Sequence, residues 1–166
     1  MVYYTKNTKE ERKKLMNDEI LRIALKAAQQ AYDCDEVPVG AVIFDSVTKN
    51  ILYTTFNQTE TLKDPTAHAE LLAIQKACQI LNEKRLNGYS MFVTLEPCAM
   101  CAGAIAWARL DSLYFGASDP KSGGVQQGAC VFSHPQTHHK ISVSGGYSAD
   151  IFGQLLTSFF KSKRGK

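Results

Sequence analysis

The sequence predicts an α/β fold, a three-layer α/β/α sandwich in which helices cover both faces of a mixed five-stranded sheet. Runs rich in β-branched and aromatic residues alternate with segments of helical apolar spacing, and the first two runs are joined by a short cluster of turn formers. With 166 residues the chain has the length of one domain, so we expect a single domain over 1–166.

Helices are predicted where apolar residues recur three and four positions apart. The first follows a polar, lysine-rich extension, residues 1–16, and Asn17 is a suitable amino-terminal cap for it. Ser148 is the corresponding cap of the last helix, which has a basic end. The four predicted helices span about residues 17–33, 67–81, 98–109 and 148–164.

Five runs are predicted to be strands. The first two are separated by turn-forming residues, 45–50, so an antiparallel hairpin is the simplest arrangement. Helices separate the later strands, which implies parallel pairing across crossovers. The fifth run follows the fourth at a distance too long for a tight hairpin, so we expect those two to be parallel. The five strands span about residues 37–44, 51–56, 90–95, 112–117 and 141–143.

Composition bears on compartment and partners. No run is long enough to span a membrane or to form a signal peptide, so we expect a cytoplasmic protein. The five cysteines are an odd number, and in a reducing compartment metal or redox chemistry explains Cys98 and Cys101 better than disulfides do. A net charge of +3 does not by itself indicate a nucleic-acid partner, but residues 161–166 carry four positive charges.

A candidate zinc site combines one imidazole with two thiols. Cys98 and Cys101 lie on the first turn of the predicted helix that Pro97 opens, so both sulfurs project from one face and the helix dipole favours thiolates. His68 lies at the start of the preceding helix. Three ligands leave the fourth tetrahedral position to water, which is typical of catalytic zinc. We therefore expect one Zn²⁺ per chain.

Glu70 is the candidate proton carrier of this site. It lies two residues after His68, so it can reach a zinc-bound water, whose pKa falls from 15.7 to about 7, without binding the metal itself. Glu70 would pass the proton to a ring nitrogen and later protonate the departing amine. A Cys-x-x-Cys pair alone could be a redox dithiol, but together with His-x-Glu it matches the signature of zinc nucleobase deaminases.

From about residue 20 to residue 164 the chain resembles the bacterial tRNA-specific adenosine deaminases of the cytidine deaminase-like superfamily. Four segments carry the resemblance, and the second and third are the most specific. They are residues 37–42, 64–70, 94–104 and 115–123.

The resemblance implies a zinc-dependent homodimer that converts the wobble adenosine of an arginine tRNA to inosine. It assigns zinc to His68, Cys98 and Cys101 and proton transfer to Glu70. Asn57 is expected to contact the flipped base. An anticodon loop suits this chemistry because its bases are already unstacked. The expected substrate-binding residues are Asn57, Val39, Pro97, Asp119, Lys121, Phe160, Lys163 and Arg164.

Other assignments share part of this pattern. Small-molecule deaminases that act on guanine, deoxycytidylate or riboflavin precursors have the same zinc motif. A catalytically silent RNA-binding subunit would usually lack the carboxylate of Glu70. Within the loop 122–140, residues 125–130 depart from the family's commoner sequence. We expect the histidines that follow, His134, His138 and His139, to be surface residues.

Overall fold

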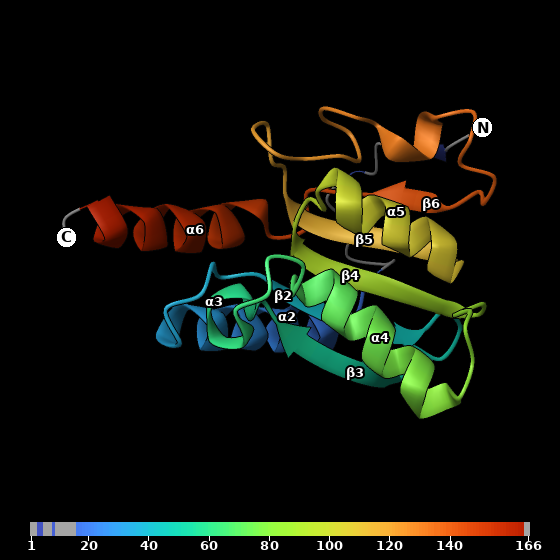
Figure 1. Cartoon of the computed structure of the whole chain (residues 1–166), viewed down its shortest axis with the longest axis horizontal. Coiled ribbons are helices and arrows are strands. Elements are labelled where there is room, and N and C mark those ends of the chain that lie inside the picture. The colour runs from blue at the N-terminus through green and yellow to red at the C-terminus, as the bar shows by residue number, and fades with distance from the viewer. Residues whose placement is uncertain (1–2, 5–7, 9–15, 165–166) are drawn as a thin grey trace.

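A mixed sheet of six strands crosses the protein in the order β1-β6-β5-β4-β2-β3 (Figure 1). The computed structural model describes residues 3–4, 8 and 16–164. The pairs β2–β3 and β2–β4 are antiparallel, whereas β4–β5, β5–β6 and β1–β6 are parallel. The strands are β1 (Tyr3–Tyr4), β2 (Gly40–Asp45), β3 (Ile51–Phe56), β4 (Tyr89–Leu95), β5 (Ser112–Ala117) and β6 (Ser142–Ser144).

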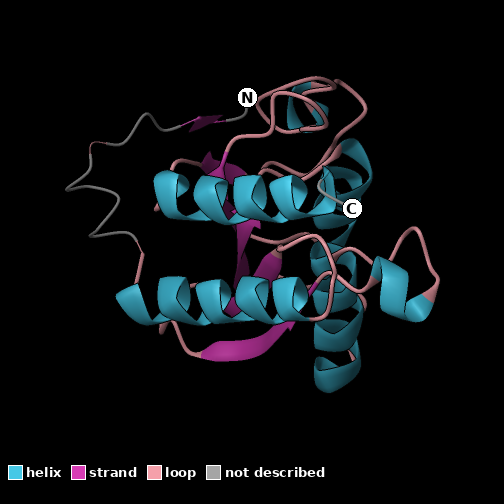
Figure 2. Cartoon of the chain, turned by 90° about the vertical axis from the view of Figure 1, so that its left-hand side faces the viewer, coloured by secondary structure: helices cyan, strands magenta, loops and turns pink. Residues whose placement is uncertain are grey.

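Helices cover both faces of this sheet, as predicted (Figures 1 and 2). Alternate residues of the central strand β4 belong to two apolar cores, one on each face of the sheet. Met91 and Val93 pack with α4 and α5, and Phe92 packs with α2 and the first turns of α6. The helices are α2 (Asp18–Asp33), α3 (Thr59–Leu62), α4 (Ala69–Leu81), α5 (Ala99–Ala108) and α6 (Ala149–Arg164), with a 3₁₀ turn η1 (Val131–Ser133).

The five strands expected from the sequence are all present, and the parallel pairing of the fourth and fifth is confirmed by β5 and β6. The sheet gains β1, which lies inside the segment 1–16 that we expected only to be an extension. Apart from β1, Thr8 and Met16, that extension lies outside the described residues.

The predicted first strand begins three residues too early. It begins at Gly40 instead of residue 37, because Pro38 has no N–H for a ladder bond and Val39 turns back to donate to the carbonyl of Val37 at 2.7 Å. Gly40 is required where the strand begins. A Cβ there would lie 2.5 Å from the carbonyl oxygen of Ala24, so α2 packs directly on the backbone of β2.

The four predicted helices each begin one or two residues later than expected, and at two of them the difference positions the site. The helix predicted from residue 67 starts at Ala69, with His68 as its cap, and the helix predicted from Cys98 starts at Ala99, with Cys98 as its cap. The single turn α3 has too few apolar residues to be recognised from periodicity. None of the helices in the described ranges is both long and apolar enough to cross a membrane.

Candidate active site

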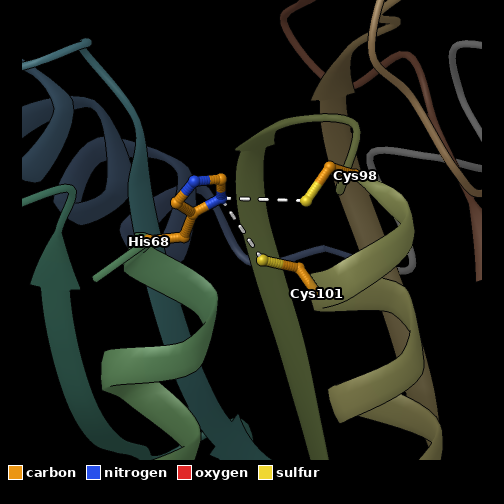
Figure 3. Close-up of side chains that lie close together, drawn as sticks. All are labelled: His68, Cys98 and Cys101. Carbon is orange, nitrogen blue, oxygen red and sulfur yellow. Dashed lines mark hydrogen bonds between the residues drawn. The ribbon is translucent and has the colours of Figure 1, made fainter. Parts of the chain in front are cut away.

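Two helices that start side by side on the same face of the sheet define the site. His68 (φ −70°, ψ 149°) precedes α4 and Cys98 (φ −69°, ψ 172°) precedes α5, and both have extended backbone conformations. Neither side chain forms the capping hydrogen bond that is common at such positions. The imidazole and the thiol are therefore directed at each other across the gap between the helix ends (Figure 3).

The three predicted ligand atoms converge at distances suited to a metal ion. The His68 Nδ1 atom lies 3.8 Å from Sγ of Cys98 and 3.5 Å from Sγ of Cys101 (Figure 3). Tetrahedral zinc, with Zn–S near 2.3 Å and Zn–N near 2.0–2.1 Å, places its nitrogen and sulfur ligands about 3.6 Å apart. All three atoms lie within 4.8 Å of one another, so this donor set fits one zinc ion.

The charges of these ligands are coupled through short contacts. The Cys101 thiol hydrogen-bonds to Cys98, which together with His68 lowers the pKa of Cys98 to about 4. The same bond and burial raise the pKa of Cys101. The bond to Cys98 also raises the pKa of His68. Cys98 is thus a thiolate at neutral pH, whereas Cys101, whose pKa is raised, must lose its proton to bind a metal.

Glu70 lies in the first turn of α4, beside the three ligands, and is 4% exposed. Burial is the main cause that raises its pKa, to about 7, while its own backbone N–H and the charge of His68 partly oppose the shift. A carboxyl group with this pKa exchanges protons readily near neutral pH. Glu70 therefore has the property that a general acid–base group requires.

Asn57 is held by an acid that sequence reasoning did not single out. Its Nδ2 donates to Oε2 of Glu36 at 3.0 Å and to the hydroxyl of Thr59 at 3.2 Å. Glu36 is fully buried, and although burial acts to raise its pKa, hydrogen bonds from Thr61 and Thr59 outweigh that effect and hold the pKa below its usual value. The sequence signal for Glu36 was its position, since it is an acidic residue directly before the apolar segment that begins at Val37.

A cationic groove of about 540 Å³ lies beside the end of β4, where Leu95 is three residues before Cys98. It combines residues from the loop after β5 with residues from α6. Phe160, 46% exposed, supplies an aromatic surface, whereas its neighbour Phe159 is buried. The predicted site residues that line this groove are Asp119, Lys121, Phe160 and Arg164, joined by Lys161.

The other predicted residues lie in different surroundings. Lys163 lines a neighbouring hollow, where its ammonium group forms an ion pair with Asp35 and lies 5.3 Å from the centre of the Phe159 ring. Val39 is 7% exposed and accepts a hydrogen bond from the Asn57 backbone at 3.0 Å. Pro97 is buried, and its carbonyl oxygen accepts a bond from Gly124 at 2.8 Å.

The histidines of the loop 122–140 do not form a second metal site within the described part of the chain. His134 and His138 are exposed, as expected of surface residues. His139 is half-buried, and its Nε2 atom lies 2.7 Å from the carbonyl oxygen of Leu110, so it is tied to the backbone near the end of α5.

Comparison with known proteins agrees with this geometry. Residues 15–117 match the family model of the cytidine and deoxycytidylate deaminase zinc-binding region. A protein of Agrobacterium fabrum named tRNA-specific adenosine deaminase is 43% identical over 144 residues, which is 87% of this chain and 93% of that protein. A protein of Aquifex aeolicus with the same name is 42% identical over 144 residues, again 87% of this chain and 93% of that protein.

Solved structures are also similar. One from work on A-to-I editing by tRNA:A34 deaminases at the wobble position of transfer RNA superposes with a TM-score of 0.81 at 41% identity, over 84% of this chain and 99% of that one. A guanine deaminase of Nitrosomonas europaea has a TM-score of 0.76 at 21% identity, over 87% of this chain and 84% of that one. The second likeness shows the fold alone.

The geometry predicts which variants lose zinc. We expect purified protein to hold one zinc ion per chain and Cys101→Ala to lose most of it, because one of the three converging donors is removed. Glu70→Gln should retain the metal, since Glu70 is assigned to proton transfer and not to coordination. Elemental analysis of the purified variants measures this. Full zinc content in Cys101→Ala, or its loss in a folded Glu70→Gln protein, would contradict the ligand assignment.

Proposed function

Because this chain belongs to the cytidine and deoxycytidylate deaminase family, and within it to the tRNA-specific adenosine deaminases, we propose that it converts adenosine to inosine at the wobble position of a tRNA anticodon loop. Arginine tRNA is the proposed substrate. The observation that carries the RNA part of the proposal is the groove of Lys121, Lys161 and Arg164, with exposed Phe160 among the three cations. Backbone phosphates and an unstacked base are suited to such a surface.

His68, Cys98 and Cys101 would hold the zinc ion, which when bound supplies a water molecule acidic enough to act as a nucleophile near neutral pH. Glu70 transfers the protons. Its carboxylate accepts a proton from the attacking water and delivers it to N1 of the adenine ring as C6 becomes tetrahedral. It then accepts the proton of the new C6 hydroxyl and delivers it to the departing amine, so the C6 carbonyl forms as the C–N bond breaks. Water and adenosine thus give inosine and ammonia, and the buried carboxyl returns to its starting state.

Asn57 is proposed to hold the flipped adenine in place. Glu36 and Thr59 already accept bonds from its Nδ2, so the side-chain amide has a fixed orientation before substrate enters. A preorganised polar group loses little entropy when it binds. Val39 and Pro97, both buried, are proposed as walls of the base pocket.

A homodimer is the proposed assembly, and the outer face of α5 is the proposed contact. Met100, Gly103, Ala104 and Trp107 follow helical spacing along one stripe, and Trp107 is 85% exposed. An indole this exposed leaves a large apolar area in water, and a second copy of the chain would bury it.

The substrate assignment predicts a preference for folded RNA. An anticodon stem-loop with adenosine at the wobble position should be deaminated with a far higher kcat/KM than free adenosine, cytidine, deoxycytidylate or guanine, because phosphate contacts add binding energy. That advantage should shrink as salt rises. Inosine is measured by chromatography of nuclease-digested RNA. Glu70→Gln is the chemical control, with kcat expected to fall by about 10²–10⁴ while RNA binding is kept. Comparable efficiency on a free base would refute the tRNA assignment.

The groove predicts unequal roles for the cations of α6. Replacing Lys161 and Arg164 together by Ala should raise KM for the stem-loop several-fold without changing kcat, since uniform binding energy is lost. The dependence of log KM on log salt should also become shallower, by roughly 0.7 per lost contact with a single strand. Lys163→Ala is the matched control, because its ammonium group is paired with Asp35. An equal KM in the double variant and the control would argue against this groove.

A single carboxylate introduced at Trp107 tests the proposed dimer contact. Trp107→Glu should shift the protein from dimer to monomer in light scattering coupled to size-exclusion chromatography, because a carboxylate would be buried in an apolar contact. Val47→Glu places the same charge at another apolar residue, 88% exposed, in the β2–β3 turn, and should remain dimeric. A monomeric unmodified protein, or a dimeric Trp107→Glu variant, would rule out this interface.

A further inference from the structure

Glu96 is a buried carboxylate that the deamination chemistry does not use. It follows the last residue of β4 and is 2% exposed. Both of its oxygens accept hydrogen bonds from backbone amides. Oε1 accepts from Val125 at 3.3 Å, Gln126 at 2.7 Å and Gln127 at 2.9 Å, and Oε2 accepts from Asp119 at 3.0 Å.

The four donors all belong to one segment, residues 119–128, which we call the 119–128 loop. Three successive N–H groups directed at one point form a concavity that binds an anion, and here the anion is a side chain of the protein itself. A buried charge is stable only when it is hydrogen-bonded, and these donors in turn need an acceptor. The carboxylate and the conformation of the loop therefore depend on each other.

The same loop lies against the backbone that carries a zinc ligand. Gly124 donates to the carbonyl of Pro97 at 2.8 Å, and Gly123 forms an isolated β-bridge with Cys98. A Cβ on Gly124 would lie 2.4 Å from the backbone nitrogen of Ala99, so glycine is needed for this close approach. One face of the loop is thus packed onto the first turn of α5.

The other end of the loop reaches the cationic groove. The Asp119 carboxylate accepts bonds from the backbone N–H groups of Lys121 and Ser122, both at 3.0 Å, and all three residues line the groove. Oε2 of Glu96 holds the N–H of Asp119, so a short series of bonds leads from the buried carboxylate to the position of Lys121.

The geometry points to Glu96 as a positioning residue for the RNA substrate. Its carboxylate fixes the 119–128 loop between Cys98 and the groove, and in this way sets where Lys121 meets the RNA backbone. Glu96 touches neither the substrate nor the metal. This inference rests on the proposed function, because it takes the groove to be the place where RNA binds.

The test is Glu96→Gln, which keeps the shape of the side chain and one carbonyl oxygen. When that oxygen stays with the three successive amides, the new NH₂ group faces the N–H of Asp119, donor against donor, and the bond to Asp119 is lost. We expect KM for the stem-loop to rise about tenfold with kcat nearly unchanged. Zinc content should remain at one per chain, and the salt dependence of KM should weaken as the contact of Lys121 is lost.

Two comparisons separate positioning from a merely structural role. Glu83→Gln makes the same chemical change at an exposed residue after α4 and should leave KM unaltered. In a double-mutant cycle, Glu96→Gln should add little to Lys121→Ala, because both changes remove the same contact. Fully additive effects, or a wild-type KM in Glu96→Gln, would overturn the inference. Loss of zinc and kcat at constant KM would also overturn it, since Glu96 would then support only Cys98.

A measurement on the unmodified protein covers the case in which Glu96→Gln does not fold. The amides of Asp119 and of residues 125–127 should exchange slowly with deuterium although they lie in a loop, and fast exchange in the zinc-loaded protein would refute the inference. The same experiments distinguish a failure of the proposed function from a failure of this inference. If the unmodified protein does not deaminate the stem-loop, the RNA assignment falls together with this inference, whereas an active protein with an unaffected Glu96→Gln variant refutes the inference alone.

Discussion

The site depends on one constraint: α4 and α5 begin side by side on the same face of the sheet. The residue before each first turn has an extended backbone and its side chain does not cap the helix, so the side chains of His68 and Cys98 project toward each other. Cys101 joins them from within the first turn of α5. The positive ends of two helix dipoles face this point, which favours thiolates and a carboxylate there. The strand order of the sheet keeps the two helix starts together.

Three glutamates are buried among the described residues, and each has different hydrogen-bond partners. Glu36 accepts bonds from Asn57, Thr59 and the Thr61 backbone, so its pKa stays low and it acts as a fixed anchor. Glu96 accepts hydrogen bonds from four backbone amides, which belong to the 119–128 loop. Glu70 has fewer compensating bonds, so desolvation dominates and raises its pKa to about 7. The acid with the fewest hydrogen-bond donors is the one suited to move protons.

The carboxy-terminal helix connects this centre to the RNA proposed to bind beside it. Phe152 packs α6 against the sheet, and farther along the helix Phe159 is buried and stacks edge-on with Tyr32 of α2. The ion pair of Lys163 with Asp35 ties the last turns of α6 to the segment after α2. Phe159 and Lys163 thus anchor the helix, whereas Phe160, Lys161 and Arg164 line the groove.

The sequence alone determined the elements and the metal ligands, because both depend on short-range patterns. Periodicity placed the main helices and strands to within a few residues, and the spacing of His68, Glu70, Cys98 and Cys101 indicated zinc chemistry. The tertiary structure decided what depends on contacts distant in sequence. The hydrogen-bond partners of Glu36 and Glu96 lie 21 to 31 positions away in the sequence. Lys163 forms an ion pair with Asp35, a contact that its neighbour Arg164 does not share. These partners are distant in sequence and come together only when the chain folds, so local spacing did not identify them.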